Sequence, residues 1–139
     1  MYNPKQGDIV FLDFSPQSGH EQAGRRPGVV ISNEQFFVRT KFAIVCPITN
    51  TSNKFPLHIL LDNRTKTTGV ILTEHMKCLD VISRNIQFVE KLPEDLLEKT
   101  LAYVKAFFWQ NGWNNRFMEW MEANYVGYNK NDKCWIWSK

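Results

Sequence analysis

The sequence predicts a mainly β protein, a small barrel or curled sheet followed by a C-terminal helix. Roughly the first ninety residues contain short apolar runs separated by polar turns, the spacing of short strands in a small β domain. Residues 93–110 then change to apolar residues at helical spacing. With 139 residues, 43% hydrophobic and 22% charged, the chain can bury a core and is too apolar for a disordered protein.

Two strands are the most strongly patterned. From Asp8 to Phe14 both faces of the alternation are largely apolar, which predicts a strand covered on both sides. The run from Phe42 to Thr49 is rich in Ile and Val and predicts another strand. Further strands are expected at 28–32, 57–61, 67–73, 76–82 and 86–89, where 67–73 and 76–82 are two strands or one bent strand. Loops are expected at 15–24 and 50–54, because these segments are rich in small and polar residues.

A helix is expected to begin near Pro93, because proline suits an early helical position and the acids that follow suit the helix dipole. Its apolar stripe is Leu97, Leu101, Val104 and Phe108, which predicts packing on the sheet. Gly112 is a plausible end.

All five tryptophans lie in the tail, at positions 109, 113, 120, 135 and 137. Asn114 to Ala123 is expected to form a second helix, and CWIWS alternates like an edge strand. We therefore expect one domain over residues 1–110 and a Trp-rich extension, 111–139, packed on it. The aromatic residues either cover the core or form an interaction surface, since aromatic clusters are enriched at interfaces.

Composition narrows the class of protein. The net charge of +3 is compatible with an anionic partner. The three cysteines, 46, 78 and 134, are odd in number and far apart, which argues against disulfides and a zinc site. The N-terminus MYNPKQGD has no apolar stretch, and no run is long enough to span a membrane. We expect a cytoplasmic protein without metal, cofactor or membrane.

The residues before the second strand are chemically unusual. Arg25 and Arg26 follow a glycine-rich loop, and guanidinium groups match phosphate oxygens bidentately. The alternative is a solvated loop with one arginine paired to Glu21. His20 in the same loop titrates near neutral pH and is able to move a proton, although a lone loop histidine is more often incidental.

Two further polar segments are candidates. Thr49 ends a strand and is followed by Asn50, Thr51 and Ser52, which are able to bond phosphate or base edges, or to form an ordinary turn. Glu74 and His75 lie among β-type residues, on the solvent face or in a site.

Together these segments resemble the MazF/PemK/Kid toxin family. The stretch GDIVFLDFSPQSGHEQAGRRPGVVIS resembles its N-terminal signature, and VCPITNTSNKFPLHILL, TTGVILTEHMKCLD and LPEDLLEKTLAYVKAFF continue the resemblance over about residues 5–108. The resemblance implies an SH3-like barrel, a homodimer with RNA in a groove at its interface, and a sequence-specific, metal-independent endoribonuclease. It also implies a toxin neutralised by a cognate antitoxin.

The resemblance also assigns residues. Arg26 matches the main catalytic arginine and Thr49 the second catalytic position. His20 falls where some members carry histidine, and Glu74 falls on an acidic position that helps catalysis or base recognition. Lys77 matches a basic position and Asp80 a structural aspartate. The chain departs from the pattern at Leu72, where the Kid branch has a catalytic arginine, at His75, usually Gln, and in the tail.

Metal-free RNA cleavage needs a base for the 2′-hydroxyl proton, a cation for the phosphorane charge and an acid for the leaving oxygen. Arg26 suits charge stabilisation, Thr49 suits a phosphate oxygen, and His20 or Glu74 suits the base, giving 2′,3′-cyclic phosphate and 5′-hydroxyl ends. The expected RNA-binding residues are Arg25, Gln22, Asn50, Thr51, Ser52, Lys54 and Lys77. The alternatives are a CcdB-like gyrase poison on the same fold and a lapsed RNA-binding module.

Overall fold

The computed structural model describes residues 2–14, 24–51, 57–108, 125–129 and 134–137. Along the chain the elements are β1 (Asp8–Asp13), β2 (Arg25–Val30), α1 (Glu34–Thr40), β3 (Phe42–Thr49), β4 (His58–Leu60), β5 (Val70–Leu72), the short 3₁₀ turn η1 (Thr73–His75), β6 (Lys77–Asp80), β7 (Gln87–Lys91), α2 (Glu94–Phe108), β8 (Tyr125–Asn129) and β9 (Cys134–Trp137). The predicted class, mainly β with a C-terminal helix, is confirmed.

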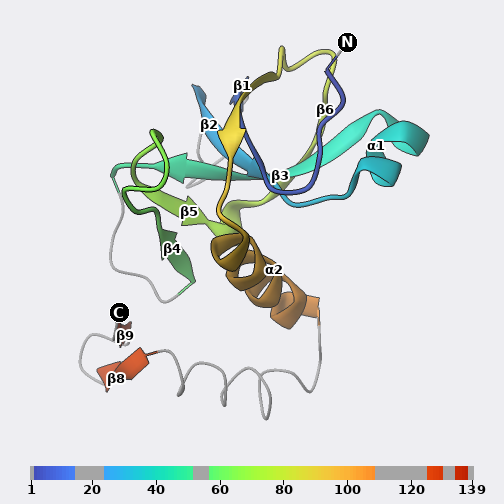
Figure 1. Cartoon of the computed structure of the whole chain (residues 1–139). Coiled ribbons are helices and arrows are strands. Elements are labelled where there is room, and N and C mark those ends of the chain that lie inside the picture. The colour runs from blue at the N-terminus through green and yellow to red at the C-terminus, as the bar shows by residue number, and fades with distance from the viewer. Residues whose placement is uncertain (1, 15–23, 52–56, 109–124, 130–133, 138–139) are drawn as a thin grey trace.

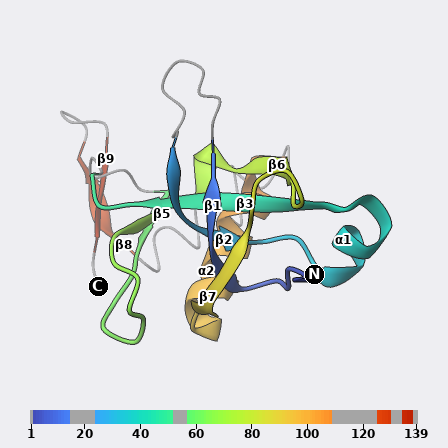
Figure 2. The same ribbon diagram turned by 90° about the horizontal axis from the view of Figure 1, so that it is seen from above.

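The long strand β3 organises the main antiparallel sheet. The strand order is β4-β5-β3-β2-β1-β7, and β6 also pairs with β3. One edge of β3 pairs with β2, and the other is shared by β6, opposite residues 42–45, and β5, opposite 48–49. The α1 helix lies at one end of β3 and the β4–β5 pair at the other (Figure 1). From above, β1 and β2 cross the line of β3, so the sheet is strongly curled (Figure 2).

Of the two expected forms, a small barrel or a curled sheet, the structure has the curled sheet, and the ring of strands does not close among the described residues. Among the described strands, β4 and β7 are the two ends of the path and do not pair with each other. Instead, α2 joins these ends by side-chain packing: Leu96 and Tyr103 share a buried cluster with Ile59 of β4 and with Leu92 after β7. Short alternating strands predict curling, but whether the last ladder forms depends on what packs between the ends.

Two buried clusters lie on the two faces of β1, as its pattern predicts. Ile9 belongs to the cluster beneath α2, whereas Val10, Leu12 and Phe14 belong to a second cluster on the opposite face. The strand is therefore covered on both sides over this stretch.

Several element boundaries differ from expectation. β2 begins at Arg25, three residues earlier than expected, so both arginines belong to the strand. α1 was not predicted, although Asn33 caps it by accepting a hydrogen bond from the Phe36 amide and Glu34 lies in its first turn. The 67–82 region forms two strands, β5 and β6, separated by η1.

The α2 helix packs on the sheet as expected, but the face that it buries is not the predicted stripe. It buries Leu96, Thr100, Tyr103 and Ala106, whereas Leu97, Leu101 and Val104 are half-buried and Phe108 is 71% exposed. Thr100 tolerates burial because its hydroxyl donates to the Leu96 carbonyl. Within the described ranges no helix has the length and apolarity needed to cross a bilayer.

In the tail, β9 pairs with β8 in a two-stranded sheet, so CWIWS does not extend the main sheet among the described strands. The expected helix over Asn114 to Ala123 and the tryptophans at 109, 113 and 120 lie outside the described residues. Packing of residues 111–139 on the domain stays a prediction.

Candidate functional site

The register of β2 and β3 indicates where Arg26 and Thr49 lie relative to each other. The two strands pair Val30 with Val45 and Gly28 with Pro47. The same register, continued for two residues, sets Arg26 opposite Thr49. Side chains two residues apart in a strand share a face, so both project on the face of Gly28. Gly28 is needed there because a Cβ would lie 2.6 Å from Val45 Cγ1 and 3.0 Å from the Cys46 carbonyl oxygen.

Thr49 is 6% exposed and is held from two sides. Its Oγ1 lies 3.0 Å from Thr51 Oγ1 and accepts a hydrogen bond from the Thr51 amide at 3.2 Å. On the β5 side, Gly69 has a φ of +117°, and a Cβ there would lie 2.4 Å from the Thr49 carbonyl oxygen. Only glycine fits this conformation and this close approach, so Gly69 helps to fix the end of β3.

Arg25 lies on the opposite face from Arg26. Its guanidinium stacks over the Phe11 ring, 4.8 Å from the centroid. It also donates to the Asn85 carbonyl at 3.4 Å and to Gln87 Oε1 at 3.3 Å. The two arginines therefore do not grip one phosphate side by side, because strand alternation points them apart.

Glu74 lies in η1 between two histidines. Its Oε1 is 2.5 Å from His58 Nε2 and 3.5 Å from His75 Nε2. The His58 contact was not predicted, because it depends on β4–β5 pairing, which sets His58 opposite Leu72. The sequence signal that bears on this contact is the alternation of residues 57–61, which puts His58 on the face away from Ile59.

The charge of Glu74 also reaches Cys46 in β3. Burial raises the pKa of the Cys46 thiol to about 12, and the Glu74 carboxylate contributes to the increase. The thiol is therefore neutral at physiological pH and is not a candidate nucleophile.

Three other predicted residues, Asn50, Lys77 and Asp80, lie in the described ranges. Asn50 accepts a hydrogen bond from Thr68, and Lys77 is opposite Val45 in the β3–β6 ladder. Asp80 accepts from the amides of Ile82 and Ser83, as a structural aspartate in a turn would. His20, Gln22, Ser52 and Lys54 lie outside the described residues, as does Glu21. No cluster of three or more potential metal ligands occurs among the residues that the structure describes.

The 62–68 loop, which leads into Gly69, is fixed by carboxylates at both ends. Arg64 pairs with Asp62 and bidentately with Asp95 at the start of α2, at 2.8 and 3.0 Å. These hydrogen bonds lower the pKa of both aspartates. Glu90 of β7 accepts from the Lys66 and Thr67 amides; burial raises the pKa of Glu90, but these bonds outweigh it and the net shift is downward.

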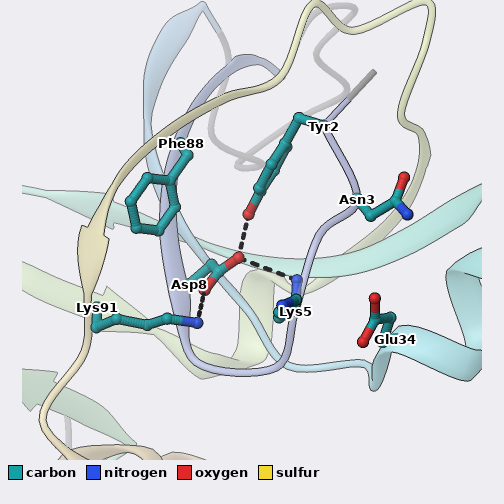
Figure 3. Close-up of a pocket in the computed structure, with 7 residues that line it drawn as sticks. All are labelled: Tyr2, Asn3, Lys5, Asp8, Glu34, Phe88 and Lys91. Carbon is teal, nitrogen blue, oxygen red and sulfur yellow. Dashed lines mark hydrogen bonds and ion pairs between the residues drawn. The ribbon is translucent and has the colours of Figure 1, made fainter.

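An open pocket lies elsewhere, at the start of β1 (Figure 3). Its buried Asp8 accepts from Tyr2 Oη, the Lys5 amide and Lys91 Nζ, so both carboxylate oxygens are engaged. Burial raises the pKa of the Tyr2 phenol, and the hydrogen bond to Asp8 raises it further. The cluster anchors the N-terminal segment to β7, and both oxygens of its carboxylate take part in that anchor.

Arg26 and Thr49 thus provide a permanent cation and a hydroxyl on one face, where a phosphate would meet both. Glu74 adds a carboxylate on a neighbouring segment. These groups suit charge stabilisation and proton transfer at a phosphodiester without a metal ion.

Comparisons with known proteins agree with this chemistry. Residues 5–108 match the profile of the family described as PemK-like, MazF-like toxin of type II toxin-antitoxin system. Endoribonuclease toxin MazF of Escherichia coli (strain K12) is 35% identical over 78 residues, 56% of this chain and 69% of that protein. Endoribonuclease EndoA of Bacillus subtilis (strain 168) is 33% identical over 100 residues, 68% of this chain and 85% of EndoA.

Solved structures show the same fold. The crystal structure of MazF (Form-I) from Deinococcus radiodurans matches with a TM-score of 0.74 at 32% identity, covering 78% of this chain and 98% of that one. The crystal structure of MazE-MazF (Form-II) from the same organism matches with a TM-score of 0.68 at 32% identity, covering 78% and 97%.

Proposed function

The chain belongs to the family of PemK-like and MazF-like toxins of type II toxin–antitoxin systems, and we propose that it is a sequence-specific, metal-independent endoribonuclease that cuts single-stranded RNA. The observation that carries the proposal is the β2–β3 register, Gly28 opposite Pro47, which, continued for two residues, would set Arg26 opposite Thr49 on one face of the sheet. The names of its relatives MazF, PemK and EndoA, all endoribonucleases, support the same activity.

Each residue has a defined task in the proposed reaction. The 2′-hydroxyl loses its proton to Glu74 or His20 and its oxygen attacks the phosphorus. Arg26 stabilises the extra negative charge that develops on the phosphorane, and the Thr49 hydroxyl donates to a non-bridging oxygen. The bond from phosphorus to the 5′ oxygen breaks and that oxygen gains a proton. The products are a 2′,3′-cyclic phosphate and a 5′-hydroxyl.

The RNA strand on either side of the cut would be held by polar and basic residues at the ends of β2, β3 and β6. We propose Gln22, Arg25, Asn50, Thr51, Ser52, Lys54 and Lys77 for this role. Arg25, on the other face, would contact phosphates away from the cut. The protein would act as a homodimer in the cytoplasm. A cognate antitoxin would restrain it. The similarity to a MazF chain that was crystallised together with MazE supports a protein partner.

The test is cleavage of a long single-stranded RNA in EDTA, with the new 5′ ends sequenced. Arg26→Ala should abolish cleavage, because it removes the cation that stabilises the phosphorane, whereas the circular dichroism spectrum should show that the protein still folds. Arg39→Ala, which removes an exposed arginine of α1, controls for the lost charge and should cut normally.

Two results would contradict the proposal. Cleavage by purified Arg26→Ala at the wild-type rate would remove Arg26 from the site. A folded wild-type protein that leaves every RNA intact would instead be a binding protein on this fold, and gyrase inhibition would then identify the CcdB-like alternative.

A further inference from the structure

Among the residues that the structure describes, the carboxylate of Glu74 is contacted through one oxygen. Both histidine contacts, His58 Nε2 at 2.5 Å and His75 Nε2 at 3.5 Å, are to Oε1. A carboxylate has two acceptor oxygens, and no residue in the described ranges donates to Oε2. The side chain of Glu74 is 28% exposed and that of His58 is 11% exposed. Oε1 is thus anchored from inside the protein, whereas Oε2 is available to a ligand.

The contact between His58 and Glu74 follows from the pairing of β4, β5 and β3. β5 pairs Val70 with Thr49 on one side and Leu72 with His58 on the other. Alternation puts Thr49, Val70, Leu72 and His58 on one face of this sheet, opposite the buried Ile48, Ile59 and Ile71. Leu72 is itself buried and apolar, so the ionisable partner of His58 comes from two residues further along, at Glu74.

The Asp8 cluster shows what a purely structural carboxylate looks like in this protein. Both Asp8 oxygens are engaged by three donors and the side chain is buried. Glu74 differs because no donor among the described residues contacts its Oε2 and because its side chain is 28% exposed. A histidine that donates one N–H to a carboxylate fixes the direction of the second oxygen, and misplacing a reacting group by about 1 Å can cost about a hundredfold in rate.

We propose that His58 is a positioning residue for RNA cleavage, and that it acts by holding Glu74 Oε1 so that Oε2 faces the 2′-hydroxyl of the bound RNA. The proposal rests on the function proposed above. In the step, the 2′-hydroxyl proton passes to Oε2 and the 2′ oxygen bonds to phosphorus. The bond from phosphorus to the 5′ oxygen breaks, and the leaving oxygen takes a proton from water. His58 keeps its own proton throughout.

The experiment is a double-mutant cycle in full-length protein, with kcat and KM measured on one short RNA that the wild type cuts. His58→Leu removes the donor and keeps an apolar volume of similar size. His58→Gln is the matched control, because its side-chain N–H₂ reaches about as far as the histidine Nε2. Both changes are also made in a Glu74→Gln background, and thermal unfolding is recorded for every variant.

We expect His58→Leu to lower kcat about ten- to a hundredfold with KM within about twofold, and His58→Gln to recover most of the loss. In the Glu74→Gln background, His58→Leu should cost no more than about twofold, because the group it positions is already disabled. If His58→Leu does not fold, His58→Asn, whose amide is too short to reach Oε1, replaces it in the same cycle.

Three outcomes would overturn the proposal. An equal loss from His58→Leu with and without Glu74 would show that His58 does not act through the carboxylate. Wild-type kcat in His58→Leu would show that no positioning is needed. A folded wild-type protein that cuts no RNA would remove the proposed function, and this inference with it; the first two outcomes are distinct because they require an active wild type.

Discussion

Two adjacent arginines at the start of β2 have different surroundings on the two faces of the sheet. Arg26 projects on the face where Thr49 ends β3 and where the β4–β5 pair carries His58. Arg25 projects on the other face, over the Phe11 ring and against Gln87. Strand alternation puts polar groups from three segments on the first face, whereas Arg25 contacts an aromatic ring and a turn carbonyl on the second.

The difference shows that the arginine pair in the sequence is not a functional pair. A loop would have allowed both guanidinium groups to turn toward one phosphate. A strand forces alternate residues apart, so the site contains one arginine and gains its other groups from neighbouring strands. The predictions below test this division between the faces.

After Arg26→Ala, the largest effect is expected at Thr49, on the same face. Thr49→Val keeps the shape of the buried side chain and removes its hydroxyl, so kcat for RNA cleavage should fall about a hundredfold, the usual cost of losing one donor to a developing oxyanion. Thr51→Ala is the control: it removes the partner of that hydroxyl and should cost less than about tenfold. Equal losses in the two variants would mean that the hydroxyl only shapes the turn.

A smaller effect is expected at Gly69, which supports the same face from β5. Gly69→Ala should lower the free energy of unfolding by about 1–3 kcal/mol, because alanine is strained at a φ of +117° and its Cβ would meet the Thr49 carbonyl. Urea unfolding measures this loss. Gly24→Ala has the strain of a φ of +81°, but a Cβ there would meet no described atom within 4 Å. The free energy of unfolding should therefore fall less than in Gly69→Ala. A larger loss at Gly24 would contradict the role given to the contact.

The smallest effect is expected at Arg25, on the opposite face. Arg25→Ala should leave kcat within about twofold and raise KM a few fold, through a lost phosphate contact. Stability should fall by about 0.5–1 kcal/mol, as for an exposed cation–π pair. Steady-state cleavage and urea unfolding measure the two. A loss of kcat in Arg25→Ala as large as that expected for Arg26→Ala would show that the two faces do not differ in function.

Much of the fold could be predicted from local patterns. The β1 and β3 strands follow from alternation and β-branched residues, and α2 begins close to Pro93 as predicted. The missed α1 had a readable signal, an Asn33 cap followed by Glu34, but it lies between two apolar strands that dominate the pattern. The face of α2 was misplaced because Thr100 is polar in type yet satisfies its hydroxyl within the helix.

The candidate site was predictable only in part. Arg26, Thr49 and Glu74 follow from the resemblance to the toxin family, and the register of β2 and β3, extended two residues beyond the Gly28–Pro47 pair, sets the first two opposite each other. The contact between His58 and Glu74 spans sixteen residues of sequence and requires the β4–β5 register, which no local pattern specifies. The open edge of the sheet is likewise set by the packing of α2, a tertiary event.

The tethered 62–68 loop has a practical consequence for protein engineering. Arg64 is committed to two aspartates, and the amides of Lys66 and Thr67 are committed to Glu90. A peptide tag or fluorescent probe inserted in this loop would break these bonds and release Gly69 from the end of β3. In the turn after β6, the amides of Ile82 and Ser83 are bonded to Asp80, but the Ile82 side chain is exposed, so a reporter attached to a side chain at position 82 would leave those bonds in place.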